Sequence, residues 1–88
     1  MNNNYIFQRL IATFDLSRNH ELVAKIFELG GQRSEVTKSL VKSWRTHEVG
    51  NRNYRPMRDE ALVSFIDGIQ DATKSGLIVI YTSDNDDA

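Results

Sequence analysis

The chain has 88 residues, enough for one domain with a single modest core, because a chain of this size buries roughly 60–65% of the surface that its unfolded form exposes. It contains no cysteine, which excludes a disulfide framework, a thiolate zinc site and a thiol nucleophile, and which suits a reducing cytoplasm. No signal-peptide pattern and no apolar run of membrane-spanning length occurs, so we expect a cytoplasmic protein with no membrane partner.

The net charge of −1 hides a strong division of charge along the chain. Residues 32–58 carry seven basic and two acidic side chains, whereas residues 59–88 carry seven carboxylates and one lysine. Such segregation is typical of a protein that binds a charged partner or that has an internal dipole, rather than of a uniformly solvated surface.

The first two helices are predicted from apolar residues that recur every three and four positions. The asparagines at 2–4 can cap a helix that runs to about Asp15. Ser17 or Asn19 can cap a second helix, which ends at the glycines 30–31 because glycine readily adopts the left-handed conformation that closes a helix. The predicted core residues of these helices are Tyr5, Ile6, Phe7, Leu10, Ile11, Phe14, Leu22, Val23, Ile26, Phe27 and Leu29.

A third helix is predicted to begin at its N-cap Ser34 and to close on Trp44, with Glu35 in its first turn. Its predicted buried stripe is Val36, Leu40, Val41 and Trp44, and its predicted exposed face includes Lys38, Lys42 and Arg45. With the second helix and the glycine turn it forms a helix-turn-helix-like pair, a scaffold that either contacts nucleic acid or simply packs. Basic side chains on a helix are usually only solvated, and the alternative is a recognition helix.

Residues 46–58, here called the arm, show no sustained period and predict a loop held down by Tyr54 and Met57. The arm carries an arginine at every third position, namely Arg52, Arg55 and Arg58. Arginines with an interleaved aromatic suit a phosphate backbone or a stacked base. With equal weight, the same arginines could pair with the acidic C-terminal part of the chain.

A fourth helix is predicted to open at Asp59 and Glu60, whose charges suit a helix N-terminus. Gly68 lies inside it at a cost to helix stability, which predicts a close approach by another helix. The β-branched residues 77–82 predict a short extended segment, and residues 83–88 an acidic disordered tail. The chain therefore divides into a single helical domain, residues 1–82, and a tail, residues 83–88, with an all-α fold of four helices.

Catalytic chemistry finds little support in the sequence. His20 and His47 have no Ser, Asp or Glu at a spacing that would indicate a catalytic site. The pair Asp67 and Asp71 is more simply explained as part of a solvated helix face. The glycines 30–31 lack the lysine and the preceding strand of a phosphate-binding loop. We expect no enzyme, no cofactor and no bound metal.

One group of short elements carries a resemblance: Asn3-Asn4, Phe14-Asp15-Leu16, Ile26-Phe27-Glu28-Leu29-Gly30-Gly31, Ser34, Val41, Trp44, Asp59-Glu60, Leu62 and Phe65-Ile66-Asp67-Gly68-Ile69. Together they resemble one repeat of the YehS-like family of small bacterial proteins. That family is a domain of unknown function, usually built as two tandem copies of an all-helical unit. The resemblance implies the fold over residues 3–69, and it implies no activity.

The chain departs from that family pattern in three ways. It has a single repeat, so a homodimer could supply the second copy. The segment after Trp44 is basic and rich in asparagine, where the family tends to be acidic with an Asp-Asp-Pro-like turn. Arg58 stands where the family tends to place a capping serine. These departures favour an altered partner surface.

Two hypotheses of function follow from the residues. In the first, a regulatory protein binds DNA or RNA, and its affinity falls steeply with salt. The residues expected to make that contact are Lys38, Lys42, Arg45, Arg52, Tyr54, Arg55 and Arg58. In the second, the chain is a protein-interaction module, such as a regulator or an inhibitor carried by a mobile element or phage. A purely structural homodimer through residues 77–81 is a third, weaker alternative.

Overall fold

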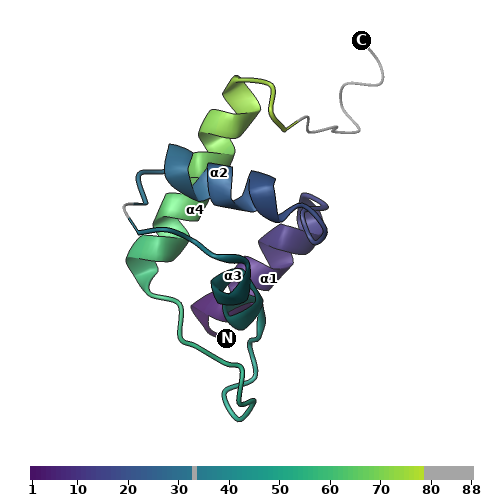
Figure 1. Ribbon diagram of the computed structural model, residues 1–88, viewed down its shortest axis with the longest axis vertical. Helices are drawn as coiled ribbons and strands as arrows, with labels where there is room; N and C mark the ends of the chain where they lie inside the picture. The colour runs from purple at the N-terminus through teal and green to yellow at the C-terminus, as the bar shows by residue number, and fades with distance from the viewer. Residues whose placement is uncertain (33, 79–88) are drawn as a thin grey trace.

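The computed structural model describes residues 1–32 and 34–78, and within them it contains helices and no strand. The helices are α1 (Asn3–Thr13), α2 (His20–Leu29), α3 (Lys38–Arg45) and α4 (Asp59–Lys74). α2 crosses α4, α3 packs against α1, and the arm lies at the opposite end of the molecule from the C-terminal end of α4 (Figure 1). The all-α prediction of four helices is confirmed. The extended segment was predicted over residues 77–82. Residues 77–78 instead form a bend in which the N–H groups of Leu77 and Ile78 donate to the Ala72 carbonyl at 2.8 and 3.2 Å, and residues 79–82 and the predicted tail lie outside the described residues.

The core is built around four aromatic side chains, one from each helix. Phe7, Phe27 and Phe65 are fully buried, and the Phe65 ring centroid lies 4.8 Å from that of Phe7 and 4.9 Å from that of Phe27. Trp44 of α3 joins them, with its ring centroid 5.5 Å from that of Phe27. Because aromatic rings bury large areas and pack at these separations, this cluster ties all four helices into one core.

The helix starts confirm two predicted caps and correct a third. The Asn2 side chain accepts the Tyr5 N–H at 2.8 Å, and the Asn19 side chain accepts the Leu22 N–H at 3.1 Å. The third helix was expected to begin at Ser34. Its N-cap is instead Thr37, whose hydroxyl accepts an N–H at 3.1 Å, so Glu35 precedes the helix rather than lying in its first turn.

The late start of α3 has a tertiary cause. α2 packs on α4 whereas α3 packs on α1, so the chain must cross from one pair of helices to the other before it can coil again. The described residues between the two helices, 30–32 and 34–37, lie along that crossing. The connection is longer than the few-residue turn expected of a helix-turn-helix, and α3 is correspondingly short, from Lys38 to Arg45.

α2 and α4 meet at two glycines. A Cβ added at Gly68 would lie 1.8 Å from the carbonyl oxygen of Ile26, and one added at Gly30 would lie 1.6 Å from that of Ser64. The predicted close approach at Gly68 is thus confirmed. Gly31, with a φ of 90°, is the residue that takes the left-handed conformation and closes α2.

Candidate nucleic-acid interface

The arm is fastened to α1 by the buried side chain of Asn4. This asparagine is 1% exposed, and its amide group donates to the carbonyl oxygens of Thr46 at 3.1 Å and Arg55 at 2.7 Å. Its carbonyl oxygen accepts the N–H of Met57 at 2.9 Å. One side chain therefore satisfies backbone groups at both ends of the arm, which fixes the spacing between them.

The neighbouring asparagines extend this anchorage. Asn2 donates to the carbonyl oxygen of His47 at 3.0 Å, while Asn3 donates to that of Met57 at 3.0 Å and to the Asp59 carboxylate at 2.6 Å. Sequence reasoning treated the asparagines only as helix caps and missed this role. The helical spacing held a clue, because Asn4 lies three residues before the buried Phe7 and so shares its face.

The tip of the arm, residues 48–53, has a folded conformation of its own. The Asn51 N–H donates to the Glu48 carbonyl at 2.9 Å, and the Tyr54 N–H donates to the Asn51 carbonyl at 3.0 Å. The Asn51 side chain also accepts the Asn53 N–H at 2.9 Å, as in an Asx turn. The tip protrudes at the lower end of the molecule in Figure 1.

Arg45 differs from the other predicted contact residues because its guanidinium is used inside the protein. It is half-buried, and it donates to the Gln8 side chain at 2.9 Å and to the Ser17 carbonyl at 3.3 Å. These bonds join α3 to α1 and to the turn after α1. Arg45 therefore helps to position α3, and a ligand would have to compete with two internal bonds to engage it.

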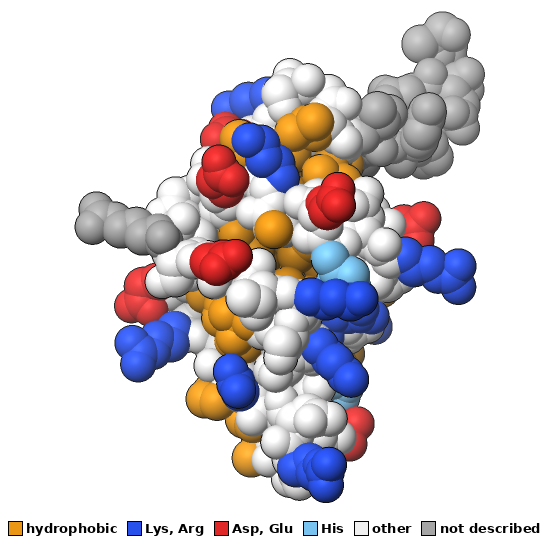
Figure 2. Space-filling model, in the orientation of Figure 1, with side chains coloured by type: hydrophobic (Ala, Val, Ile, Leu, Met, Phe, Trp, Pro, Cys, Tyr) orange, Lys and Arg blue, Asp and Glu red, His pale blue; other side chains and the backbone are white. Residues whose placement is uncertain are grey.

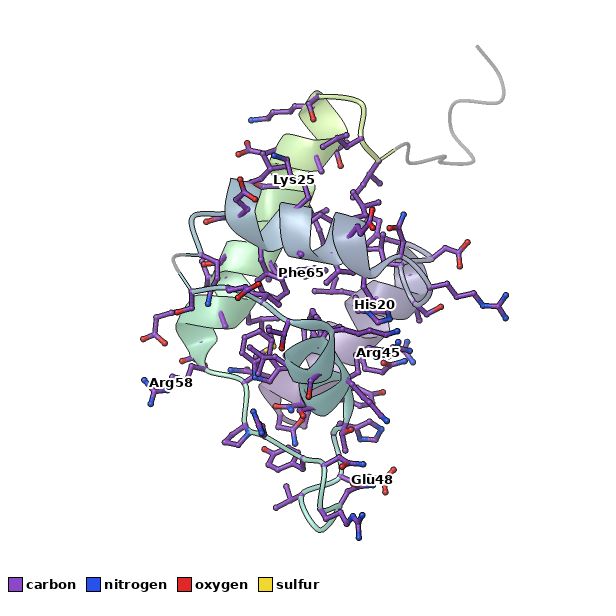
Figure 3. All side chains as sticks on the ribbon, in the orientation of Figure 1. His20, Lys25, Arg45, Glu48, Arg58 and Phe65 are labelled. Carbon is purple, nitrogen blue, oxygen red and sulfur yellow. The ribbon has the colours of Figure 1, made fainter. Side chains whose placement is uncertain are left out.

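The remaining predicted residues are distributed over α3 and the arm. Lys38 and Lys42 of α3 and all three arginines of the arm are exposed, whereas Tyr54 is half-buried. In Figure 3, Arg58 projects from the opposite side of the molecule to Arg45. The structure thus brings the predicted residues to one end of the molecule without gathering all of them on one face.

Basic and acidic side chains are separated on the surface of the protein, as they are along its sequence. Figure 2 shows Lys and Arg side chains mainly over the lower part of the molecule, around α3 and the arm, and Asp and Glu mainly over α2 and the upper part. Within residues 1–32 and 34–78, the ion pair is Lys25 with Glu28, at 3.7 Å, and none involves an arginine of the arm. Pairing of the arm with the carboxylates at 84, 86 and 87 lies outside the described residues.

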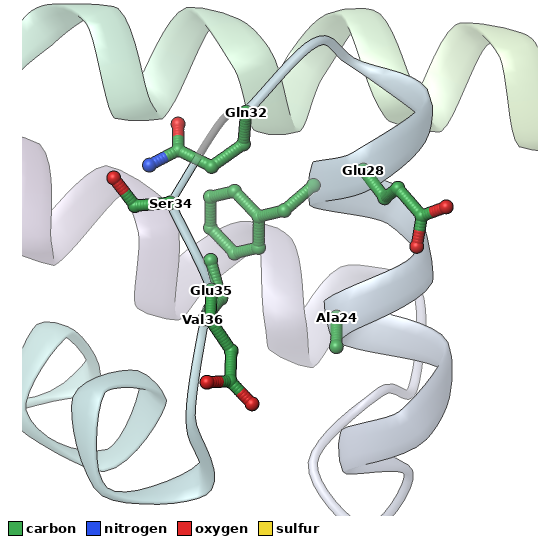
Figure 4. Close-up of a pocket in the computed structure, with 7 residues that line it drawn as sticks. Ala24, Glu28, Gln32, Ser34, Glu35 and Val36 are labelled. Atoms are coloured by element: carbon green, nitrogen blue, oxygen red, sulfur yellow. The ribbon is translucent and has the colours of Figure 1, made fainter.

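The pockets of the described chain do not gather catalytic groups. One hollow of about 350 Å³ lies between α2 and a lining made by Gln32 and residues 34–36, and Figure 4 shows the carboxylates of Glu28 and Glu35 at separate edges of it. A second, of similar size, lies beside Trp44 and is bordered by Arg58 and Glu60. In the part of the chain that the structure describes, no three His, Cys, Asp or Glu side chains are placed to hold a metal ion.

Comparison with known proteins places the chain in a family. None of the helices in the described residues has both the length and the apolar character needed to cross a bilayer. No curated protein and no solved structure shows a significant match to the chain. A family model described as "Protein of unknown function (DUF1456)" matches residues 3–74, which include all four helices and the arm. The chain therefore belongs to the DUF1456 family of proteins of unknown function.

Proposed function

We propose that this protein is a non-enzymatic regulator that contacts the phosphate backbone of nucleic acid through α3 and the arm. The observation that carries the proposal is the set of exposed basic side chains at one end of the molecule, Lys38, Lys42, Arg52, Arg55 and Arg58, which form no ion pair with the described residues. When exposed cations of this kind contact phosphates, they release the counterions bound to the nucleic acid. Binding can therefore gain free energy even though the protein has no overall positive charge.

The anchored arm supports this proposal. A flexible basic loop would lose conformational entropy when it bound, whereas the bonds from Asn4 already hold the ends of the arm in place. The short α3 exposes two lysines and few groups suited to reading base edges. The contact we propose therefore positions the protein on phosphates, with α3 lying against the backbone rather than reading sequence.

Fluorescence anisotropy with labelled duplex DNA tests the proposal. We expect Arg52→Glu with Arg55→Glu to lower affinity by about tenfold or more, since two phosphate contacts become repulsive. The matched control reverses Arg18 and Lys25, two exposed cations outside α3 and the arm, and changes the net charge by the same amount. If both variants lost affinity equally, the loss would depend only on net charge and not on the position of the cations. No binding of the natural chain at low salt would overturn the proposal.

A second candidate function, a protein-interaction module, is favoured by the surface of α4. Val63 and Ile66 are 53% and 39% exposed, and they continue at a spacing of three and four residues into Gln70 and Thr73. Such a stripe is typical of helices that pair. The occupant we propose is α4 of a second copy of the chain in antiparallel orientation. This homodimer would supply the missing repeat of a YehS-like protein in the cytoplasm.

Charge complementarity supports the second copy as the occupant. Glu60, Asp67 and Lys74 are all exposed and lie seven positions apart along the same edge of the stripe. Antiparallel pairing sets Glu60 of each copy against Lys74 of the other, which gives two attractive contacts, and it sets the two copies of Asp67 against each other, which gives one repulsive contact. Sedimentation analysis should show a weak dimer that Glu60→Lys disrupts and that Glu60→Lys with Lys74→Glu restores. A monomer at every concentration would contradict the dimer, and it would leave nucleic-acid binding untouched.

A further inference from the structure

The tip of the arm has a feature that phosphate contact alone does not require. Val49 is 71% exposed there, although an apolar side chain gains nothing from contact with water. Beside it, Arg52 and Asn53 are also exposed, and both present N–H donors. The tip thus combines one apolar group with several hydrogen-bond donors on a narrow, protruding turn.

The conformation of the tip is fixed by hydrogen bonds inside the turn and by the attachment of the arm to α1. Three hydrogen bonds close the turn between Glu48 and Tyr54, and Asn4 clamps the arm where it leaves the body of the protein. Because both sets of bonds hold the protrusion in one shape, it loses little conformational entropy when it binds a partner. This is the behaviour expected of an element that enters a groove.

We infer that the tip of the arm enters the minor groove of duplex DNA, preferentially over A·T pairs; this inference rests on the proposed nucleic-acid function. The floor of that groove presents only acceptors at A·T pairs, which match the donors of Arg52 and Asn53. The narrow groove of an A-tract also has an enhanced negative potential that attracts arginine. Val49 provides the apolar contact that minor-groove proteins commonly insert.

The surroundings of the tip favour a duplex over a single strand. Single-strand binding relies on exposed aromatic side chains that stack on bases. Within the described residues no aromatic side chain is fully exposed: Trp44 is 8% exposed, and Tyr5, Phe14 and Tyr54 are half-buried. Arg55 and Arg58 follow the tip and can meet the phosphates that border the groove. Glu48 opposes binding, because its exposed carboxylate at the tip would approach the same phosphates (Figure 3).

The test compares A·T-rich and G·C-rich duplexes of equal length by anisotropy, with netropsin as a competitor that occupies the minor groove. We expect the A·T-rich duplex to bind about tenfold more tightly, and netropsin to displace the protein from it. Arg52→Lys keeps the charge but loses the planar donor fork, so it should reduce the A·T preference to about threefold or less. Val49→Ser should weaken A·T binding alone, and Glu48→Gln should strengthen binding to both duplexes.

The outcomes separate this inference from the function on which it rests. Equal affinity for the two duplexes, with no displacement by netropsin, would overturn insertion into the groove and leave phosphate contact standing. No binding to either duplex at low salt would overturn both. Val49 and Arg52 are exposed, so neither variant should alter thermal unfolding, and an unchanged melting temperature shows that any loss of affinity arises at the tip.

Discussion

Asn4 is the residue on which the arm depends, and its removal gives the first prediction. Asn4→Ala leaves the Met57 N–H and two carbonyl groups without their partner in a site that is 1% exposed. Because unsatisfied buried groups keep their full desolvation cost, we expect the free energy of unfolding to fall by about 2–3 kcal/mol in a urea titration. Amide hydrogen exchange of Met57 should accelerate as well.

The neighbouring asparagine provides the control for that experiment. Asn3 is only partly buried and bonds to groups close to the surface, so Asn3→Ala should cost about 1 kcal/mol or less. If the two substitutions proved equally costly, the special role of Asn4 would be contradicted, and the arm would be held mainly by Met57, which is 4% exposed.

The same residue marks a limit of inference from sequence. The role of Asn4 depends on partners that lie 42 to 53 positions away in the sequence, and no local pattern shows where those partners return to α1. Arg45 illustrates the same limit. Its place on a basic helix face predicts contact with a ligand, whereas its bonds to Gln8 and Ser17 arise only from the packing of α3 on α1.

Among the elements, the crossing of α2 and α4 yields the second prediction. Helix propensity alone predicts that Gly68→Ala stabilises α4 by about 0.5–1 kcal/mol. The new Cβ would lie 1.8 Å from the Ile26 carbonyl oxygen, so α2 must shift away. We expect a net loss of about 2–3 kcal/mol in the free energy of unfolding, measured by urea denaturation, because overpacking outweighs propensity.

Gly50→Ala provides a matched substitution at the tip of the arm. A Cβ at Gly50 meets no atom within 4 Å, so its effect should stay within about 0.5 kcal/mol. Stabilisation by Gly68→Ala would contradict the close crossing. The comparison is informative because the sign of the effect, and not only its size, distinguishes helix propensity from packing.

The elements themselves were largely predictable. The three- and four-residue spacing of apolar side chains located all four helices, because each helix must present one face to the shared core. The start of α3 was not predictable in the same way. Ser34 and Thr37 are both good N-caps. The choice between them depends on how far the chain must run from the end of α2, which packs on α4, to the place on α1 where α3 packs.

For the molecule as a whole, the distribution of charge gives the last prediction. Five exposed cations on α3 and the arm set an upper limit to the phosphates that this end of the protein can contact. Since each contact contributes about −0.9 to the slope of log K against log salt on duplex DNA, we expect a slope between about −3.6, for four contacts, and about −4.5, for five. The shallower limit applies because Arg58 projects away from α3.

The slope also tests whether the two proposed surfaces act separately. The arm precedes the N-terminus of α4, so antiparallel pairing through α4 would place the two arms at opposite ends of a dimer (Figure 1). Each protomer would then bind DNA independently, and Ile66→Glu should abolish self-association while leaving the slope unchanged. A slope steeper than about −5, or one that becomes shallower in the Ile66→Glu variant, would mean that cations beyond this set or from both protomers share one duplex. The basic end would then work only within the assembled pair.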